Sequence, residues 1–161
     1  MQRVTNCIIV DHHQVLLIKK PRRGWYAIPG GKMEQGETIK ESVIREVQEE
    51  TALNIHSPQL AGVFTFSIFE QEHTINEWMM FTFITDQYSG SLTNYCEEGE
   101  LEWVAIDRIN ELPMAEGDLK IFDRIFSAKD ILYGAFSYTP EYDLIGYRLE
   151  QPPSIEGGEF K

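Results

Sequence analysis

Apolar residues in this chain gather in short, β-branched runs that polar segments separate. The runs at residues 4–10 and 15–18 flank four polar residues, which predicts a β-hairpin near the N-terminus. Two longer strand-like stretches, residues 60–69 and 77–85, are joined by the polar segment EQEHTIN, and a shorter stretch follows at 101–106. This pattern predicts an antiparallel-looking sheet.

Two segments follow a helical period instead. Thr38 is followed three residues later by Glu41, which is the spacing of a capping box, so we expect a helix from Ile39 to Thr51. A second amphipathic helix is predicted at 117–126, where apolar positions recur at helical spacing. These positions are Leu119, Phe122, Ile125 and Phe126.

The last apolar segments, residues 131–138 and 142–149, predict a C-terminal hairpin around Thr139-Pro140-Glu141. A two-stranded hairpin is marginal alone and needs a surface to pack on, either its own sheet or a second subunit. Exposed aromatic side chains on both arms favour the second subunit. We therefore predict a homodimer in which this hairpin contributes to the interface.

The length of 161 residues and the 42% hydrophobic content suit one globular domain with a small appendage. We divide the chain into a main domain at 1–130, a hairpin extension at 131–150 packed on the same domain, and a mobile tail at 151–161. The tail, QPPSIEGGEFK, has no periodic pattern.

The formal net charge of −12 argues against a nucleic-acid polymer or a membrane surface as partner, because both attract basic proteins. Cys7 and Cys96 do not form a C-x-x-C motif, so we expect reduced thiols rather than a disulfide framework. No apolar run is long enough to span a bilayer or to form a signal peptide. These features predict a soluble, cytoplasmic protein.

Three acids crowd the end of the first predicted helix. At about 100° per residue, Glu46, Glu49 and Glu50 fall within one arc beside the apolar flank of the helix. Like charges at this spacing repel, and the single guanidinium of Arg45 cannot neutralise three carboxylates. A hard divalent cation such as Mg²⁺ can, since it prefers oxygen ligands.

A solvated acidic face is the commoner explanation of a Glu-rich helix. The adjacent glycines Gly30 and Gly31, just upstream, favour the metal instead, because they let a main-chain carbonyl turn toward a cation on the helix. The two features together predict a metal site built from the turn and the helix.

Residues 31–53 resemble the Nudix box, a motif with fixed spacing over 23 residues. The matching positions are Gly31, Glu37, Arg45, Glu46, Val47, Glu49, Glu50 and Leu53. Ala52 departs from the motif, which usually has glycine there. The likeness extends more loosely over residues 2–128.

The resemblance implies an α+β protein with the Nudix fold, an α/β/α sandwich around a mixed sheet, here with the C-terminal β-hairpin extension. It also implies a hydrolase that cleaves a nucleoside diphosphate linked to a further group, with Mg²⁺ or Mn²⁺ as cofactor. The implied metal ligands are Glu46, Glu49, Glu50 and the Gly30 carbonyl. Arg45 would orient these carboxylates together with Glu37, and Lys32 would face the substrate phosphates.

Two further groups enter by position. In the acidic stretch EEGE, Glu98 resembles the distant metal ligand or general base of some relatives, although Glu97 and Glu100 compete for the role. Either Glu46 or Glu98 could be the base. Arg22 and Arg23 could contact phosphate or a base, or could belong to a solvated loop.

The substrate implied by size and layout is an oxidised purine nucleoside triphosphate such as 8-oxo-dGTP, in the manner of MutT-like diphosphatases. Relatives that act on ADP-ribose tend to carry a proline some fifteen residues beyond the box, where this chain has Ser67-Ile68-Phe69. Guanosine alarmones are an alternative substrate. A Nudix-fold regulator that has lost catalysis is an alternative of another class, although the box glutamates are all present.

Overall fold

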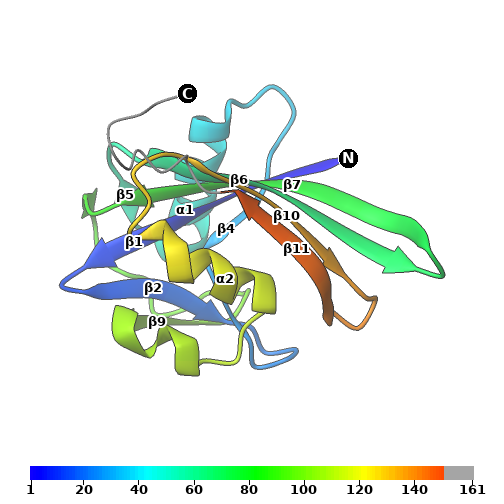
Figure 1. Ribbon diagram of the computed structural model, residues 1–161. Helices are drawn as coiled ribbons and strands as arrows, with labels where there is room; N and C mark the ends of the chain where they lie inside the picture. Colours follow the sequence, from blue (N-terminus) through cyan, green and yellow to red (C-terminus); the bar gives the residue numbers. More distant parts are fainter. Residues whose placement is uncertain (151–161) are drawn as a thin grey trace, which may run out of the picture.

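The computed structural model describes residues 1–150, and the predicted mobile tail lies outside this range. Its elements follow in the order β1 (Gln2–Asp11), β2 (Gln14–Lys19), β3 (Tyr26–Ala27), β4 (Gly30–Lys32), α1 (Ile39–Thr51), β5 (Asn54–Ile55), β6 (Gln59–Glu70), β7 (His73–Thr85), β8 (Tyr88–Ser89), β9 (Glu100–Ala105), the 3-10 helix η1 (Ile106–Glu111), α2 (Glu116–Ile125), β10 (Leu132–Tyr138) and β11 (Leu144–Glu150). Figure 1 shows how they are arranged.

Nine of the strands form one sheet in the order β11-β10-β6-β7-β1-β2-β3, in which β4 also pairs with β1 and β9 with β2, while β5 and β8 form a separate pair. Strand β1 belongs to two parts of this sheet. Its N-terminal portion lies between β7 and β4, while its last residues turn into the predicted hairpin with β2. The antiparallel pairing that the apolar pattern predicts is present between β6 and β7 and between β2 and β9. The pattern does not predict that β1 pairs parallel with β7 and β10 parallel with β6, which makes the sheet mixed.

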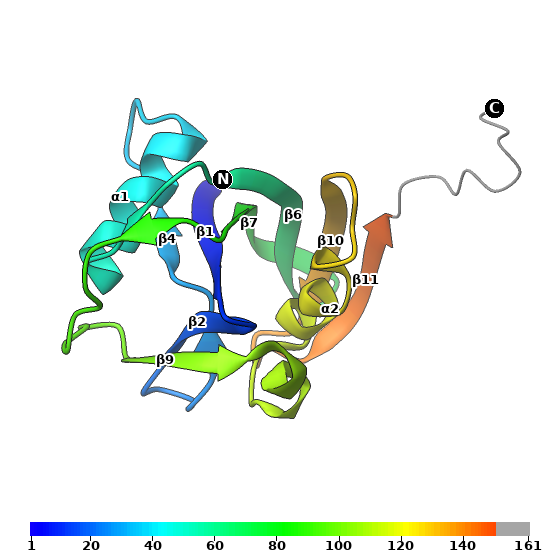
Figure 2. The same cartoon turned by 90° about the vertical axis from the view of Figure 1, so that its left-hand side faces the viewer.

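The two helices cover opposite faces of the sheet. Alternate residues of β1 divide between two cores: Cys7 and Ile9 pack with Val43 and Val47 of α1 in one. Ile8 packs on the other side, in the core that contains three apolar residues of α2. These are Ile121, Phe122 and Ile125. The layers are visible in Figure 2, and the arrangement confirms the predicted α/β/α sandwich around a mixed sheet.

Most of the polar segment EQEHTIN belongs to strands and not to a loop. β6 continues to Glu70 and β7 begins at His73, so only Gln71 and Glu72 form the turn, with φ of 51° and 66°. A turn with positive φ at both central residues matches the twist of the strands it joins, but it is usually marked by glycine or asparagine. This chain has neither there, which is why the predicted strands were too short.

The C-terminal hairpin forms as predicted, with β10 antiparallel to β11. It joins the sheet through β6, and its inward side chains Phe136 and Tyr138 are buried in the molecule's own core. Part of the aromatic surface that suggested a subunit interface is therefore already used. Tyr133, Ile145 and Tyr147 remain exposed.

Candidate functional site

Helix α1 begins and ends at the predicted residues. The Thr38 side chain accepts a hydrogen bond from the Glu41 backbone, and the Glu41 carboxylate accepts one from the Thr38 backbone, so the capping box is complete. At the other end Ala52 has φ 65° and ψ 7°, the left-handed conformation that glycine adopts most readily. The departure from the box motif thus falls at the helix cap.

Arg45 holds three of the acids in place. Its Nε and Nη2 donate to the two oxygens of Glu37 at 2.7 and 2.9 Å. Its Nη1 donates to Glu46 at 2.9 Å and to Glu49 at 3.2 Å, and Nη2 also reaches the Lys32 carbonyl at 3.1 Å. The hydrogen bond with Arg45 is the main reason that the pKa of Glu37 is lowered to about 2. Glu37 is therefore ionised at neutral pH, and Arg45 links it to Glu46 and Glu49.

The glycine pair is required by close packing. A Cβ on Gly31 would overlap the Glu46 carboxylate, and one on Gly30 would overlap the backbone of β1 at Thr5 and Asn6. Strand β4 can thus lie between β1 and α1 only because both residues lack a side chain. As a result the Gly30 N–H donates to Glu50 Oε1 at 3.0 Å.

Glu50 differs from its neighbours because it is buried, with 7% of its surface exposed. Its Oε2 has no hydrogen-bond partner among residues 1–150. Burial raises the pKa of Glu50 to about 7, against the opposing effects of the Gly30 hydrogen bond and the Lys20 charge. A buried carboxylate oxygen without a partner is costly, and a cation would satisfy it. The acids therefore fit the hard, oxygen-seeking metal that their chemistry suggests.

The acids line an open cleft of about 770 Å³. It is bordered by Val4, Lys20, Gly30, Gly31, Lys32, Glu46, Glu49, Glu50, Tyr95, Cys96, Glu97 and Glu98. The wall opposite α1 is the acidic loop, residues 93–99, from which Glu98 forms an ion pair with Lys20 at 3.3 Å. Lys20 and Tyr95 also border the cleft and are not among the predicted site residues. The available signal was the position of Lys20 at the end of a strand, directly before a turn.

Some predicted site residues lie elsewhere. Arg22, Arg23 and Glu100 are not among the residues that border the cleft. Arg23 instead donates to the Glu141 carbonyl at 3.1 Å and lies 5.0 Å from the ring centroids of both Trp25 and Tyr142. A part for Arg22 and Arg23 in substrate binding stays a prediction, as do the metal-binding and catalytic roles of the acids.

Within residues 1–150, no three acidic, histidine or cysteine side chains are already gathered tightly enough to hold a metal ion. This agrees with the pairing described above, because Glu46 is bonded to Arg45 while Glu98 is bonded to Lys20. Two acids of the cleft are thus already paired with side-chain cations.

Comparison with known proteins decides the family. The model of the NUDIX domain matches residues 1–125. This chain belongs to the Nudix family. It is 51% identical over 150 residues to the uncharacterized Nudix hydrolase YvcI of Bacillus subtilis, a match that covers 93% of this chain and 95% of that protein.

A crystal structure of a MutT protein from Bacillus halodurans has a TM-score of 0.91 and 50% identity, and covers 95% of this chain and 100% of that chain. At lower identity, 26% over 124 residues, the chain resembles a putative 8-oxo-dGTP diphosphatase of Bacillus subtilis, covering 77% of this chain and 79% of that protein. The match to the NUDIX domain ends at residue 125. The likeness to the Bacillus halodurans protein covers 95% of this chain and therefore includes residues of the C-terminal hairpin.

The protein is therefore a MutT-like Nudix hydrolase, which acts on nucleoside diphosphate derivatives. Enzymes of this family generally use divalent metal ions. Among the described residues, no helix is long and apolar enough to cross a membrane.

Proposed function

We propose that this Nudix hydrolase cleaves an oxidised purine nucleoside triphosphate such as 8-oxo-dGTP to the monophosphate and pyrophosphate, with Mg²⁺ or Mn²⁺ as cofactor. The observation that carries the metal-dependent reaction is the buried, partnerless Oε2 of Glu50 in a cleft that also contains two lysines. The substrate is supported by likeness to the putative 8-oxo-dGTP diphosphatase of Bacillus subtilis.

In this proposal Glu46, Glu49, Glu50 and the Gly30 carbonyl hold the metal, which when bound neutralises phosphoryl oxygens and lowers the pKa of a water. Arg45 fixes the direction of Glu46 through its 2.9 Å hydrogen bond. We propose Glu98 as the general base, because it lies on a loop and its side chain is largely exposed. The Glu46 carboxylate, in contrast, packs directly against Gly31. Lys32 contacts the phosphates.

The nucleobase end of the cleft is proposed to include Tyr95. This side chain borders the cleft and is 75% exposed, although an aromatic ring usually packs against its own protein. Stacking of a purine on the ring would cover it without demanding a particular hydrogen-bond pattern. Tyr95→Ala is expected to raise KM for the nucleotide with a smaller change in kcat.

A hydrolysis screen tests the proposal. The purified protein is given 8-oxo-dGTP, dGTP, a guanosine alarmone and ADP-ribose, each with Mg²⁺, with Mn²⁺ and with excess chelator, and the products are separated. We expect the highest kcat/KM for 8-oxo-dGTP, release of pyrophosphate and no turnover in chelator. Reaction in ¹⁸O-labelled water identifies the phosphorus that is attacked.

Other results would replace the proposal in specific ways. Preferred turnover of the alarmone would move the enzyme to guanosine tetra- and pentaphosphates, and release of orthophosphate from a triphosphate would indicate another binding register. Tight binding of a nucleotide with no turnover in either metal would indicate a non-catalytic regulator. Turnover in excess chelator would exclude the metal mechanism.

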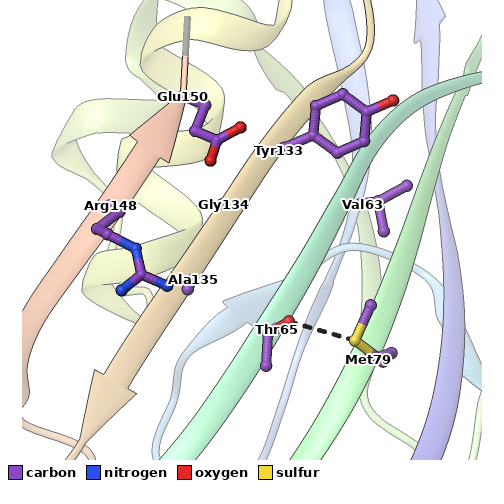
Figure 3. A pocket seen from close by; sticks show the side chains of 8 residues that line it. All are labelled: Val63, Thr65, Met79, Tyr133, Gly134, Ala135, Arg148 and Glu150. Atoms are coloured by element: carbon purple, nitrogen blue, oxygen red, sulfur yellow. Dashed lines mark hydrogen bonds between the residues drawn. The ribbon is translucent and has the colours of Figure 1, made fainter.

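We also propose a homodimer formed through the outer face of β6, β7, β10 and β11, where Figure 3 shows one of two shallow pockets. The exposed Tyr133 and the side chains of Val63 and Met79 form an apolar patch there. Arg148 and Glu150 border the same pocket, so the face carries both signs of charge. A second copy turned by a two-fold axis can therefore place an arginine against an acid.

Light scattering on size-separated protein tests this interface. The intact protein is expected to have the mass of a dimer, and Tyr133→Lys the mass of a monomer with unchanged melting temperature, because Tyr133 is half-exposed. Lys129→Glu, a charge change outside the patch, is the control. A monomeric wild-type protein, or a Tyr133→Lys protein that stays dimeric, would contradict the interface.

A further inference from the structure

The acidic loop is anchored at both ends across the cleft. At one end the Thr93 N–H donates to the Thr51 carbonyl, at the C-terminus of α1, at 2.9 Å. At the other end Gly99 packs so closely on the Lys19 carbonyl that a Cβ would overlap it. The backbone of Glu97 and Glu98 is therefore held near the end of β2, and the direction of each carboxylate depends on its partner.

Lys20 is the partner of Glu98, and its backbone is fixed as well. Its N–H donates to the Trp25 carbonyl at 2.7 Å, and its carbonyl accepts from Gly24 at 2.9 Å. From this turn the ammonium reaches Glu98 Oε2 at 3.3 Å. The same positive charge acts on Glu50, whose pKa it lowers against the effect of burial. Lys20, Glu98 and Glu50 border the same cleft, so the charge of Lys20 acts on both acids.

Arg45 is not available to balance Glu98 and Glu50. All three nitrogens of its guanidinium are engaged with Glu37, Glu46, Glu49 and the Lys32 carbonyl, on the other side of the glycine pair. Its planar fork suits a permanent bidentate pair, whereas a lysine ammonium on a flexible stem exchanges partners more easily. The two side chains therefore differ in how firmly they are held: Arg45 is fixed by several hydrogen bonds, whereas Lys20 makes a single ion pair with Glu98.

We propose that Lys20 is an exchangeable counter-ion: it balances Glu98 and Glu50 while the site lacks metal, and it turns to the substrate phosphates when metal and nucleotide enter, which releases Glu98. Lys20 is thus a positioning residue for Glu98. The inference rests on the proposed function only in that a divalent cation binds among these acids. The identity of the nucleotide does not affect it.

The exchange couples the two ligands. In the nucleotide-free protein the Lys20 charge repels the incoming cation and offsets the attraction of Glu98 for it, which weakens metal binding. Once phosphates offer Lys20 a new partner, this opposition disappears. Metal should therefore bind more tightly when nucleotide is present, and by linkage the nucleotide should bind more tightly when metal is present.

Titration of nucleotide-free protein with Mn²⁺, followed by electron paramagnetic resonance of the free ion, tests the proposal. Lys20→Met removes the charge and keeps an unbranched side chain. Lys32→Met removes the other cleft lysine, which has no part in the proposed exchange. Lys19→Met is the matched control, since Lys19 is an exposed neighbour whose ammonium lies 5.9 Å from the centroid of the Tyr26 ring. Melting temperatures are measured for all variants.

We expect Lys20→Met to bind Mn²⁺ about fivefold to tenfold more tightly than wild type, as removal of a nearby like charge predicts. Lys19→Met should leave the Mn²⁺ affinity unchanged, and Lys32→Met should tighten it less than Lys20→Met. In a Glu98→Gln background the effect of Lys20→Met should shrink, because the ion pair is already absent. Both cleft variants should still raise KM for nucleotide.

The result that overturns the proposal is Mn²⁺ binding by Lys20→Met that is equal to or weaker than that of wild type. A tightening of the same size in Glu98→Gln would also overturn it, since Lys20 would then act without Glu98. Metal binding in the wild-type protein combined with turnover of an unexpected nucleotide would refute the proposed substrate while leaving this exchange intact.

Discussion

Two carboxylates one helical turn apart, Glu46 and Glu50, have opposite surroundings. Glu46 is bonded to Arg45, which also binds Glu37 and Glu49, so each acid on that side of the cleft has a hydrogen-bond donor within the protein. Glu50 is buried, accepts one backbone hydrogen bond and leaves its second oxygen without a partner among residues 1–150. One carboxylate is therefore held by a side-chain cation of the protein, and the other keeps an unsatisfied oxygen.

Crowding of acids is therefore not in itself the sign of a metal site. Arg45 brings several carboxylates together at little cost, because charge-assisted hydrogen bonds compensate them. The informative acid is the one that folding buries without compensation.

Glu50→Gln should have the largest effect on activity. Changes next to a metal ligand cost about tenfold to a hundredfold, so loss of a direct ligand should lower kcat by at least about a hundredfold. The metal-free fold should become more stable, because the amide carries no charge to bury. Steady-state kinetics and chemical unfolding in chelator measure the two effects.

Glu46→Gln separates the two sides. It should also lower kcat strongly, but without any gain in stability, because it weakens the hydrogen bond from Arg45 at 2.9 Å. If both variants gain stability equally in chelator, the contrast between the two carboxylates is wrong.

The pH dependence of stability should reveal Glu50 directly. Its pKa in the folded protein, about 7, lies above the ordinary value of 4.5, so the folded state holds the proton more tightly than the unfolded state. This contribution is fully present below pH 4.5 and is lost as pH rises through 7, by about 3 kcal/mol for a shift of this size.

The measurement is the unfolding free energy of metal-free protein from pH 4.5 to 8. Asp118 has a pKa raised to about 7 by burial and contributes with the same sign, so the Glu50 part is the difference between wild type and Glu50→Gln. Saturating Mg²⁺ should reduce this decline. Parallel pH profiles for wild type and Glu50→Gln in chelator would rule the effect out.

Arg45→Lys should lower activity by about tenfold to a hundredfold, since a lysine cannot reproduce the two-pronged bond to Glu37 and the contact with Glu46 at once. Stability should fall at neutral pH, and the difference from wild type should shrink as pH falls from 4.5 toward 2, because protonation of Glu37 removes this contribution from the wild type. Arg3→Lys, at the N-terminal end of β1, is the control. Wild-type kcat/KM in Arg45→Lys would show that this side needs only a positive charge.

The smallest expected effect is at the end of α1. Ala52→Gly should raise the unfolding free energy by about 1 kcal/mol, because alanine is strained at positive φ. Ala105→Gly is the matched control, since Ala105 has φ −58° and should lose stability from the same change. Urea unfolding of both variants gives the comparison, and a destabilised Ala52→Gly would refute the strain.

Local signals were enough to predict α1, because the capping box and the helical period of 39–51 are written in adjacent residues. The box motif also identified the acids in advance. Sequence could not distinguish buried Glu50 from exposed Glu49, because both lie in one arc of the helix and only the packing of β4 separates them. The contact between Lys20 and Glu98 joins residues 78 positions apart and depends on where two turns meet.

The parallel pairing of β10 with β6 was missed for a related reason. Apolar runs predict strands, but they do not state which strand lies beside which. The sequence predicts that the hairpin needs a surface to pack on, but it does not identify that surface. The packing of Phe136 of the hairpin on Phe64 and Phe66 follows only from the completed sheet. In both cases the missing information is long-range.

That pairing also sets an order of events during synthesis. Phe64 and Phe66 leave the ribosome long before Phe136, the residue that packs on both of them, has been translated. The emerging chain must therefore carry an unfinished sheet edge through the time needed to make some seventy further residues, which is when strand edges are most prone to association. A chain cut where the Nudix model stops, at residue 125, would stay in that condition permanently.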